Sequence, residues 1–426
     1  MIFQKNEYIL IFWNRLRFYG IIFKKNRVCV MIEIERKDYL NKLIRCANTP
    51  DIKVITGVRR SGKSYLLNHY IGYVKTNEVN TNIIFINLQD LDNEKLRTYK
   101  SLHNYIKSRY IAKRRNLVLV DEIQLCEKFE WAINSLHSKH MFDIYITGSN
   151  AFLLSNDLAT LFTGRTINIE VLPFSYKEYV QFHKLNNLDY SFEGYTTNGG
   201  LSGSYLYSED GDKYSYIKDV YSTIITRDLV QKYKIRNSAD LQSIANFMLD
   251  NISNLLSVDS ITKNINEAGG KITNKTVKNY ITYLENAFLY YKAARYDVKG
   301  KKHLKTNHKF YASDTGFKYA ILGKKNMDYG YVYENIVYLE LLRRGFEVYT
   351  GKLYKKEVDF VALKQNEKIY IKVSDNISNS KTLKRELLPL QSIYDAYPKF
   401  LIANTGHPDY DIEGINICNL ENWLLS

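Results

Sequence analysis

The strongest constraint on the fold is a glycine-containing segment, residues 57–64, that reads GVRRSGKS. It follows a short apolar run at 52–56 and precedes a helical pattern of apolar residues at 63–74. Between a buried strand and a helix, this spacing fits the P-loop pattern without a mismatch. The glycines let the backbone curl so that successive N–H groups and the positive helix end point at phosphate groups. The segment therefore predicts a phosphate-binding loop in an α/β domain.

Two residues of this loop carry specific chemistry. A lysine at the position of Lys63 reaches the β- and γ-phosphates, and a hydroxyl at Ser64 supplies an oxygen to Mg²⁺. The predicted cofactors are therefore ATP and Mg²⁺. The whole loop is expected to line the nucleotide, namely Gly57, Val58, Arg59, Arg60, Ser61, Gly62, Lys63 and Ser64.

An acidic pair follows a second apolar run, residues 117–120, and completes this predicted site. Asp121 is expected to hold Mg²⁺ through water, and Glu122 is expected to polarise the attacking water as a general base. The pair could instead be only the solvent-exposed end of a strand. Its sequence separation from a complete P-loop favours a catalytic role.

A third apolar run, residues 143–147, ends in small polar residues. In this class of sheet we expect that strand between the P-loop strand and the Asp-Glu strand, so that Ser149 or Asn150 orients water. The alternative is an ordinary turn after a strand.

Arg165 is a candidate for neutralising transition-state charge, in cis or from a neighbouring subunit, because an arginine is always charged. A surface salt bridge is the alternative for Arg165.

These motifs resemble those of the prokaryotic AAA-type ATPases that carry a C-terminal region of uncharacterised function. The resemblance covers about residues 31–426 and implies an ATP hydrolase with a winged helix and a restriction-endonuclease-like region. Its marks are residues 56–64, 120–124, 147–150, 164–165 with 172–175, 225–228, 333–335 and 357–360.

The predicted fold class is α/β, with a P-loop core around a parallel sheet, a helical lid and winged helix, and a C-terminal α/β nuclease-like domain. A basic extension at the N-terminus precedes the patterned sequence, and Met31 is a candidate natural start. The predicted units are the extension 1–30, the AAA-type core 31–190, the lid 191–250, the winged helix 251–318 and the nuclease-like domain 319–426.

The predicted winged helix rests on a helix-turn-helix pattern, with Thr273 as the N-cap of the second helix. Lys275, Lys278 and Asn279 on that helix could enter a major groove of double-stranded DNA while a basic hairpin grips phosphates. A winged helix used only for packing is the alternative. The basic residues of the hairpin are Lys292, Arg295, Lys299, Lys301, Lys302, Lys305 and Lys309.

In the last region, Glu334 lies on a predicted helix and Asp359 on a predicted strand. The active nuclease pattern needs a second acid and a lysine two residues beyond it, to hold a metal and activate water. Those positions are expected at Lys372 and Ser374, so the acid is missing and the lysine is displaced or lost. We expect a degenerate domain that does not cut nucleic acid, although Glu334 and Asp359 could still hold a metal weakly.

The net charge of +15 fits a polyanionic partner or, equally, a lysine-rich surface kept soluble by repulsion. Four scattered cysteines exclude a Cys-rich zinc cluster and favour a cytoplasmic location. No apolar run is long enough to span a bilayer, so no membrane association is expected.

The leading hypothesis is ATP hydrolysis that drives a conformational switch on or near DNA. A homo-oligomer is possible. An ATP-regulated metal-dependent nuclease and an ATP-sensing scaffold for a protein client are the alternatives.

Overall fold

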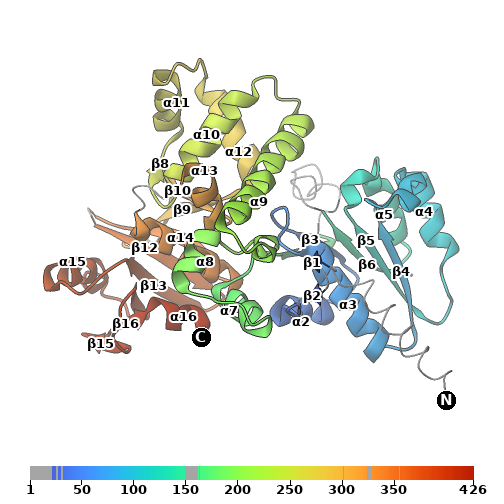
Figure 1. Ribbon diagram of the computed structural model, residues 1–426, viewed down its shortest axis with the longest axis horizontal. Coiled ribbons are helices and arrows are strands. Elements are labelled where there is room, and N and C mark those ends of the chain that lie inside the picture. The colour runs from blue at the N-terminus through green and yellow to red at the C-terminus, as the bar shows by residue number, and fades with distance from the viewer. Residues whose placement is uncertain are drawn as a thin grey trace.

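The structure is a computed structural model that describes residues 22–24, 27–29, 32–148, 162, 164–300, 302–323, 328–354 and 356–426. Two sheets lie at opposite sides of the view in Figure 1, with a group of helices at the top. The predicted residues Ser149, Asn150 and Lys301 lie outside the described residues.

The first sheet has five parallel strands in the order β4-β5-β6-β3-β7. The expected position of β6 between the P-loop strand β3 and the Asp-Glu strand β5 is confirmed. Parallel strands place all their carboxyl ends at one edge, so the segments after β3, β5 and β6 meet there. The strands are β3 (Ile52–Thr56), β4 (Thr81–Asn87), β5 (Arg115–Asp121), β6 (Asp143–Thr147) and β7 (Thr166–Glu170).

Helices cover both faces of this sheet, because alternate residues of its strands are apolar on each face. Val118 and Val120 of β5 pack in one core cluster, whereas Leu117 and Leu119 pack in the other. The first cluster includes residues of α4 (Tyr99–Ser108) and α5 (Phe129–His137), and the second includes residues of α2 (Lys37–Arg45) and α3 (Lys63–Asn77). Two short 3₁₀ turns, η1 (Leu91–Leu96) and η2 (Ile123–Leu125), complete this unit.

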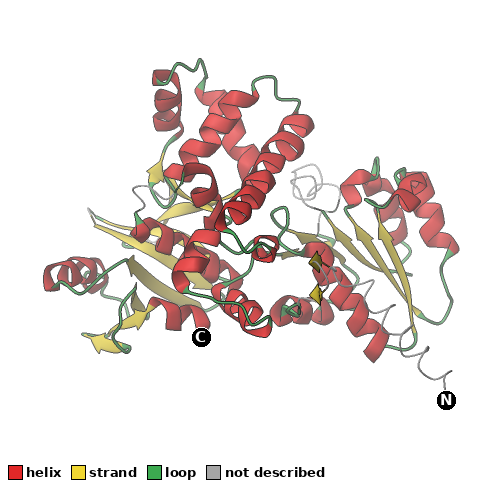
Figure 2. Cartoon of the chain, viewed as in Figure 1, coloured by secondary structure: helices red, strands yellow, loops and turns green. Residues whose placement is uncertain are grey.

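A mostly helical segment follows at residues 176–250 and is named the lid segment, or lid, after the lid predicted at 191–250 (Figure 2). It includes a π-helix, η4, which is a rare conformation that often occurs at functional sites. Its elements are α7 (Tyr176–Leu185), α8 (Phe192–Asn198), the 3₁₀ helix η3 (Ser202–Leu206), α9 (Asp210–Thr223), η4 (Ile224–Gln231) and α10 (Ser238–Asp250).

The predicted helix pair and hairpin are both present. The helices are α11 (Val258–Glu267) and α12 (Asn274–Asn286), and the side chain of Thr273 accepts a hydrogen bond from the Thr276 amide as the predicted N-cap. The hairpin consists of β9 (Tyr290–Asp297) and β10 (Lys302–Ala312), and β8 (Leu255–Leu256) pairs with β10.

The hairpin is not a free-standing wing. Strand β9 pairs in parallel with β11, and the two parts join in one nine-stranded mixed sheet in the order β15-β16-β14-β13-β12-β11-β9-β10-β8. The sheet therefore continues across the predicted boundary at residue 318. Its other strands are β11 (Glu347–Leu353), β12 (Lys356–Lys364), β13 (Glu367–Ser374), β14 (Lys399–Ala403), β15 (Tyr410–Ile412) and β16 (Ile415–Asn419).

Four helices accompany this sheet: α13 (Thr315–Leu322), α14 (Tyr329–Arg343), α15 (Ser380–Gln391) and α16 (Leu420–Leu425). The α/β class, the parallel P-loop type of sheet, the helices after it and the C-terminal mixed sheet are thereby confirmed. In the N-terminal extension, β1 (Ile22–Lys24) pairs antiparallel with β2 (Arg27–Cys29). Among the helices of the described residues, none has the length and apolar character needed to span a bilayer.

Candidate functional site

The loop between β3 and α3 adopts the backbone that its two glycines allow. Gly57 has a φ of 136°, and a Cβ atom added there would lie 2.2 Å from the carbonyl oxygen of Val171. Gly62 has a φ of 96° and forms the N-cap of α3. Both positions require glycine because an L side chain rarely adopts such backbone angles. The loop therefore leads directly into the positive end of a helix, as phosphate binding requires.

The Lys63 side chain folds back over this loop. Its Nζ donates hydrogen bonds to the carbonyl oxygens of Gly57, at 2.9 Å, and Val58, at 3.0 Å. Burial lowers the pKa of Lys63 to about 8, although Glu122 and Asp121 act to raise it. The ammonium group is therefore held over the loop by acceptors that phosphate oxygens can replace.

Asp121 and Ser64 lie together at the carboxyl edge of the sheet. The Ser64 side chain hydrogen-bonds the Asp121 carboxylate, and Thr147 of β6 donates its hydroxyl to Asp121 Oδ1. Burial raises the pKa of Asp121, and the bonds from Thr147 and Ser64 oppose that shift. Because both side chains offer oxygen ligands at one point, they fit Mg²⁺, which takes one or two protein oxygens plus phosphate and water.

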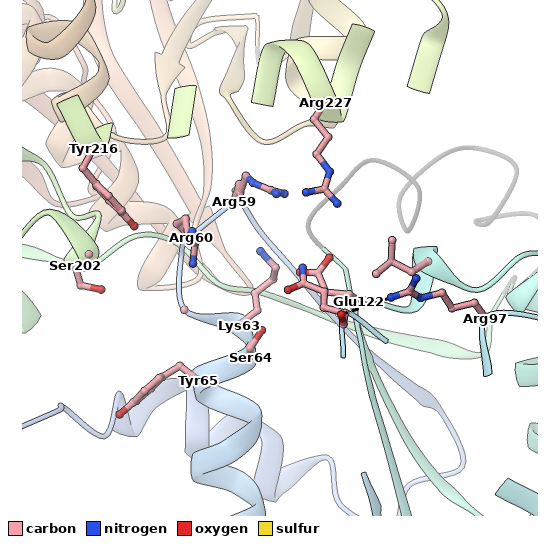
Figure 3. A pocket seen from close by; sticks show the side chains of 14 residues that line it. Arg59, Arg60, Lys63, Ser64, Tyr65, Arg97, Glu122, Ser202, Tyr216 and Arg227 are labelled. Carbon is pink, nitrogen blue, oxygen red and sulfur yellow. Dashed lines mark hydrogen bonds between the residues drawn. The ribbon is translucent and has the colours of Figure 1, made fainter. Parts of the chain in front are cut away.

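Glu122 follows with a φ of 55°, so the backbone turns sharply after β5. Its amide donates to Thr147 Oγ1 at 3.0 Å, and Gln124 Nε2 donates a hydrogen bond to its Oε2. Figure 3 shows Glu122 next to Lys63, and both side chains line the cavity. A carboxylate in this position can accept a proton from water beside the phosphates.

Lys63, Ser64 and Glu122 line a cavity of about 690 Å³ (Figure 3). Its side chains carry more positive than negative charge, which suits a polyphosphate. One wall comes from the lid through Ser202, Gly203, Tyr216 and Arg227. The core contributes Arg59, Arg60, Gly62, Lys63, Ser64, Tyr65, Gln89, Arg97, Glu122 and Leu125.

The loop and the lid are also joined by an ion pair. Arg59 Nη1 lies 3.3 Å from Asp228 Oδ1 in the π-helix η4, and burial raises the pKa of Asp228 to about 6 against the effect of Arg59. The neighbouring Arg227 extends into the cavity (Figure 3). Sequence reasoning assigned no role to Arg227 or Asp228. The only signal was the motif at residues 225–228, which carried the family resemblance.

The structure does not bring Arg165 to this cavity. The Arg165 carbonyl accepts a hydrogen bond from the Ile52 amide at the start of β3, whereas the P-loop follows the end of that strand. The strand separates the two ends by ~13 Å. Arg165 is exposed and does not line the cavity, so its role as an arginine finger, in cis or from a neighbouring subunit, stays a prediction, with a surface salt bridge as the alternative. No position is described for Asn150, so its predicted role stays a prediction.

The carboxylates that the sequence assigned to a nuclease-like pattern, Glu334 and Asp359, are paired with lysines. Lys309 of β10 places its Nζ 2.9 Å from Glu334 and 2.8 Å from Glu357. Lys372 lies 2.8 Å from Asp359, whose other oxygen accepts a hydrogen bond from the Val373 amide.

Sequence reasoning placed Lys372 where the second acid is expected but missed the contact of Lys309, which was assigned to the basic hairpin. It also missed Glu386 of α15, which lies 3.7 Å from Lys372. Burial raises the pKa of Glu334, with Lys309 opposing that shift. No group of three or more His, Cys, Asp or Glu side chains suited to a metal occurs within the described ranges.

The chain is similar to known proteins over most of its length. Residues 49–180 match the model of an AAA domain, and residues 189–328 match a domain of unknown function (DUF8612). An uncharacterized protein of Haemophilus influenzae is 34% identical over 92% of this chain and 98% of its own length. This chain belongs to the family of that protein.

A second family relative is an uncharacterized protein of Methanocaldococcus jannaschii, which is 29% identical over 79% of this chain and 78% of its own length. Solved structures that align include DnaA of Aquifex aeolicus bound to AMPPCP, with 17% identity, a TM-score of 0.32, and coverage of 60% of this chain and 89% of that one. The ORC1 protein of Aeropyrum pernix in complex with DNA aligns with 9% identity, a TM-score of 0.32, and coverage of 75% and 96%.

The lowered pKa of Lys63 predicts a pH dependence of nucleotide affinity. Lys63 is charged below its pKa of about 8 and loses its proton as the pH rises through that value. Because phosphate favours the charged form, affinity for ATP should fall up to ~10-fold between about pH 7.5 and pH 9. Calorimetric titration at constant ionic strength measures this change. A Lys63→Arg variant that still binds should show a flatter profile, and a flat wild-type profile would contradict the assignment.

Proposed function

We propose that this chain binds ATP with Mg²⁺ and hydrolyses it to drive a conformational switch. The observation that carries the proposal is the cavity, which has the P-loop and Glu122 on one wall and lid residues on the other. A nucleotide bound there touches both walls, so its hydrolysis can change how they are held together.

The residues divide the chemistry among them. The loop amides and Lys63 bind the phosphates, while Ser64 and Asp121 hold Mg²⁺, which when bound neutralises charge on the phosphate oxygens. Glu122 accepts the proton of the attacking water once its carboxylate is free of the Gln124 amide. Arg227, across the cavity, adds positive charge to the γ-phosphate end.

The switch is expected at the contact between the P-loop and η4. The Arg59–Asp228 pair joins them, and Arg227 is the residue before Asp228. A phosphate that attracts Arg59 or Arg227 competes with Asp228 for the same positive charge. Loss of the γ-phosphate therefore changes the electrostatic balance of the contact that positions the lid.

Two variants separate binding from turnover. Lys63→Ala should lose ATP binding because the phosphates lose their ammonium partner. Glu122→Gln should bind ATP but turn it over ~10² to 10⁴ times more slowly, because it cannot accept a proton. ATP affinity and steady-state hydrolysis, each with and without DNA, measure the two effects.

Lys75→Ala, on the same helix as Lys63, and Glu127→Gln, after the same strand as Glu122, are the matched controls because both side chains are exposed. An Arg227→Ala variant with unchanged turnover would remove Arg227 from the site. If the Glu122→Gln variant hydrolyses ATP at the wild-type rate, the general base is another residue. If the wild-type protein binds ATP without turnover, the hypothesis of an ATP-sensing scaffold is favoured.

We further propose that the switch operates on double-stranded DNA through α12. Lys275, Lys278 and Asn279 are exposed on this helix. The alternative, a winged helix used only for packing, has support as well. Strand β9 is held in the large sheet, and Lys299 donates a hydrogen bond to Tyr354.

A double variant, Lys275→Gln with Lys278→Gln, should weaken binding to duplex DNA. Each lost phosphate contact should reduce the slope of log affinity against log salt by ~0.9. Fluorescence anisotropy at several salt concentrations measures both quantities. Lys381→Gln with Lys384→Gln is the matched control, because these exposed lysines are also three residues apart on one helix, α15. An equal loss of affinity for duplex DNA in both double variants would show that α12 has no specific role in DNA binding.

The nuclease alternative is disfavoured by charge. A divalent ion beside Glu334 and Asp359 would lie close to the ammonium groups of Lys309 and Lys372, and like charges ~4 Å apart repel by several kcal/mol at an effective dielectric near 20. We expect no cleavage of single- or double-stranded DNA or RNA with Mg²⁺ or Mn²⁺, with or without ATP. Gel assays with the purified chain test this, and cleavage that disappears in Asp359→Ala would establish a nuclease.

A further inference from the structure

Asp314 is a buried carboxylate that joins the lid to the C-terminal part of the chain. It is the N-cap of α13, which packs against α8 and α9 of the lid (Figure 1), and its Oδ1 accepts a hydrogen bond from the Gly316 amide at 2.8 Å. Its Oδ2 accepts a second hydrogen bond, at 2.6 Å, from the Gly200 amide in the lid turn, residues 199–201. The Leu201 amide also stabilises the charged carboxylate. One side chain, only 2% exposed, thus binds the backbone of two segments that are 114 residues apart.

The lid turn is shaped to receive this carboxylate. A Cβ atom added to Gly199 would lie 1.7 Å from Asp314 Oδ1, and only glycine allows so close an approach. The Gly200 carbonyl accepts a hydrogen bond from the Phe174 amide at 2.8 Å. The Tyr205 hydroxyl donates to the Gly199 carbonyl at 2.6 Å. The turn is therefore held from three sides, and Asp314 supplies the side that belongs to the C-terminal part of the chain.

The lid turn leads directly into a wall of the nucleotide cavity. Ser202 and Gly203, the first two residues of η3, follow the turn and line that cavity. A Cβ atom added to Gly203 would lie 2.2 Å from the hydroxyl of Tyr216, which lines the cavity as well. A displacement of the turn therefore moves the wall that η3 and Tyr216 form. Lys63 and Glu122 belong to other elements and keep their own contacts.

The charge on Asp314 is more than a helix cap requires. Burial raises the pKa of Asp314 to about 7, although the amides of Gly200, Gly316 and Leu201 and the guanidinium of Arg343 act to lower it. A serine or asparagine would cap α13 about as well without a buried charge, which is unfavourable to the fold. What the carboxylate adds is a second acceptor oxygen, and the lid turn uses that oxygen.

We propose that Asp314 is a positioning residue for the nucleotide site, which holds the lid turn so that η3 forms its side of the cavity. Asp314 follows β10, so the C-terminal part of the chain contributes to nucleotide affinity. This inference rests on the proposed function, because it concerns the affinity of the same cavity for ATP. The apparent affinity of a site falls with the fraction of molecules in which the binding conformation is held.

Two variants of the full chain test this role. Asp314→Asn has the same size but turns a donor toward the amides of the lid turn, and Asp314→Ser keeps an N-cap for α13 but is too short to reach the turn. At pH 8, where Asp314 is mostly ionised, both should weaken ATP affinity at least ~10-fold, because each loses a hydrogen bond to a charged group. Turnover at saturating ATP should stay within about 2-fold of the wild type, as when binding alone is lost. Calorimetric titration and steady-state kinetics measure the two quantities.

Asp328→Asn and Asp328→Ser are the matched controls. Asp328 is the N-cap of α14 and accepts a hydrogen bond from the Gly330 amide, two residues along the chain, at 3.0 Å. Asp314 caps α13 with the same spacing, but Asp328 is exposed. The control variants should bind ATP like the wild type.

Hydrogen exchange of the ATP-free protein reports on the lid turn itself. Peptides that cover residues 199–206 should exchange at least ~10-fold faster in the Asp314 variants than in the wild type or the controls, because opening of the turn exposes its amides. Peptides of the P-loop should exchange as in the wild type.

The inference is overturned if exchange of the turn is unchanged, or if the Asp314 variants bind ATP as tightly as the wild type. Equal loss of affinity in the controls would also overturn it, as would faster exchange in all segments together with lower turnover, which indicates a general loss of stability. If the wild-type chain binds no ATP, the proposed function fails, whereas the exchange data still decide whether Asp314 holds the turn.

Discussion

The buried guanidinium of Arg36 is the interaction on which the nucleotide site depends. It donates to the carbonyl oxygens of Ser61, at 2.8 Å, and Leu172, at 2.9 Å, and pairs with Glu178 at 2.8 Å. Burial opposes the charged form of Glu178, but Arg36 outweighs it and the pKa of Glu178 is lowered. One planar group with several donors thus fixes the P-loop to the exit of β7 and to α7. The segment before the sheet and the segment after it both position the loop.

The position of the lid follows from the loop that Arg36 holds. The π-helix η4 contacts that loop through Asp228, while its neighbour Arg227 enters the cavity. A wider helical turn allows adjacent residues to face a partner and a ligand. On the other side, the 3₁₀ helix η3 contributes Ser202 and Gly203 to the nucleotide cavity. The lid therefore meets the nucleotide site through both η3 and η4.

The acidic cluster of the large sheet is neutralised by lysines of the chain itself. Lys309 and Lys372 fill the space between carboxylates, so the ammonium groups take the place that a metal ion needs. Strand β10 brings Lys309 to this cluster from a distant part of the sequence.

The sequence by itself determined the P-loop, the acidic pair after β5 and the order of β3, β6 and β5, because glycine spacing and apolar runs are local signals. It also determined the capped helix α12. Only the tertiary structure decided that Arg165 lies at the far edge of the sheet, that Arg227 lines the cavity and that Lys309 neutralises Glu334. These are contacts between residues far apart in the chain, and no local pattern encodes which distant side chain will meet a buried charge. The pairing of β9 with β11 could not be predicted from the sequence for the same reason.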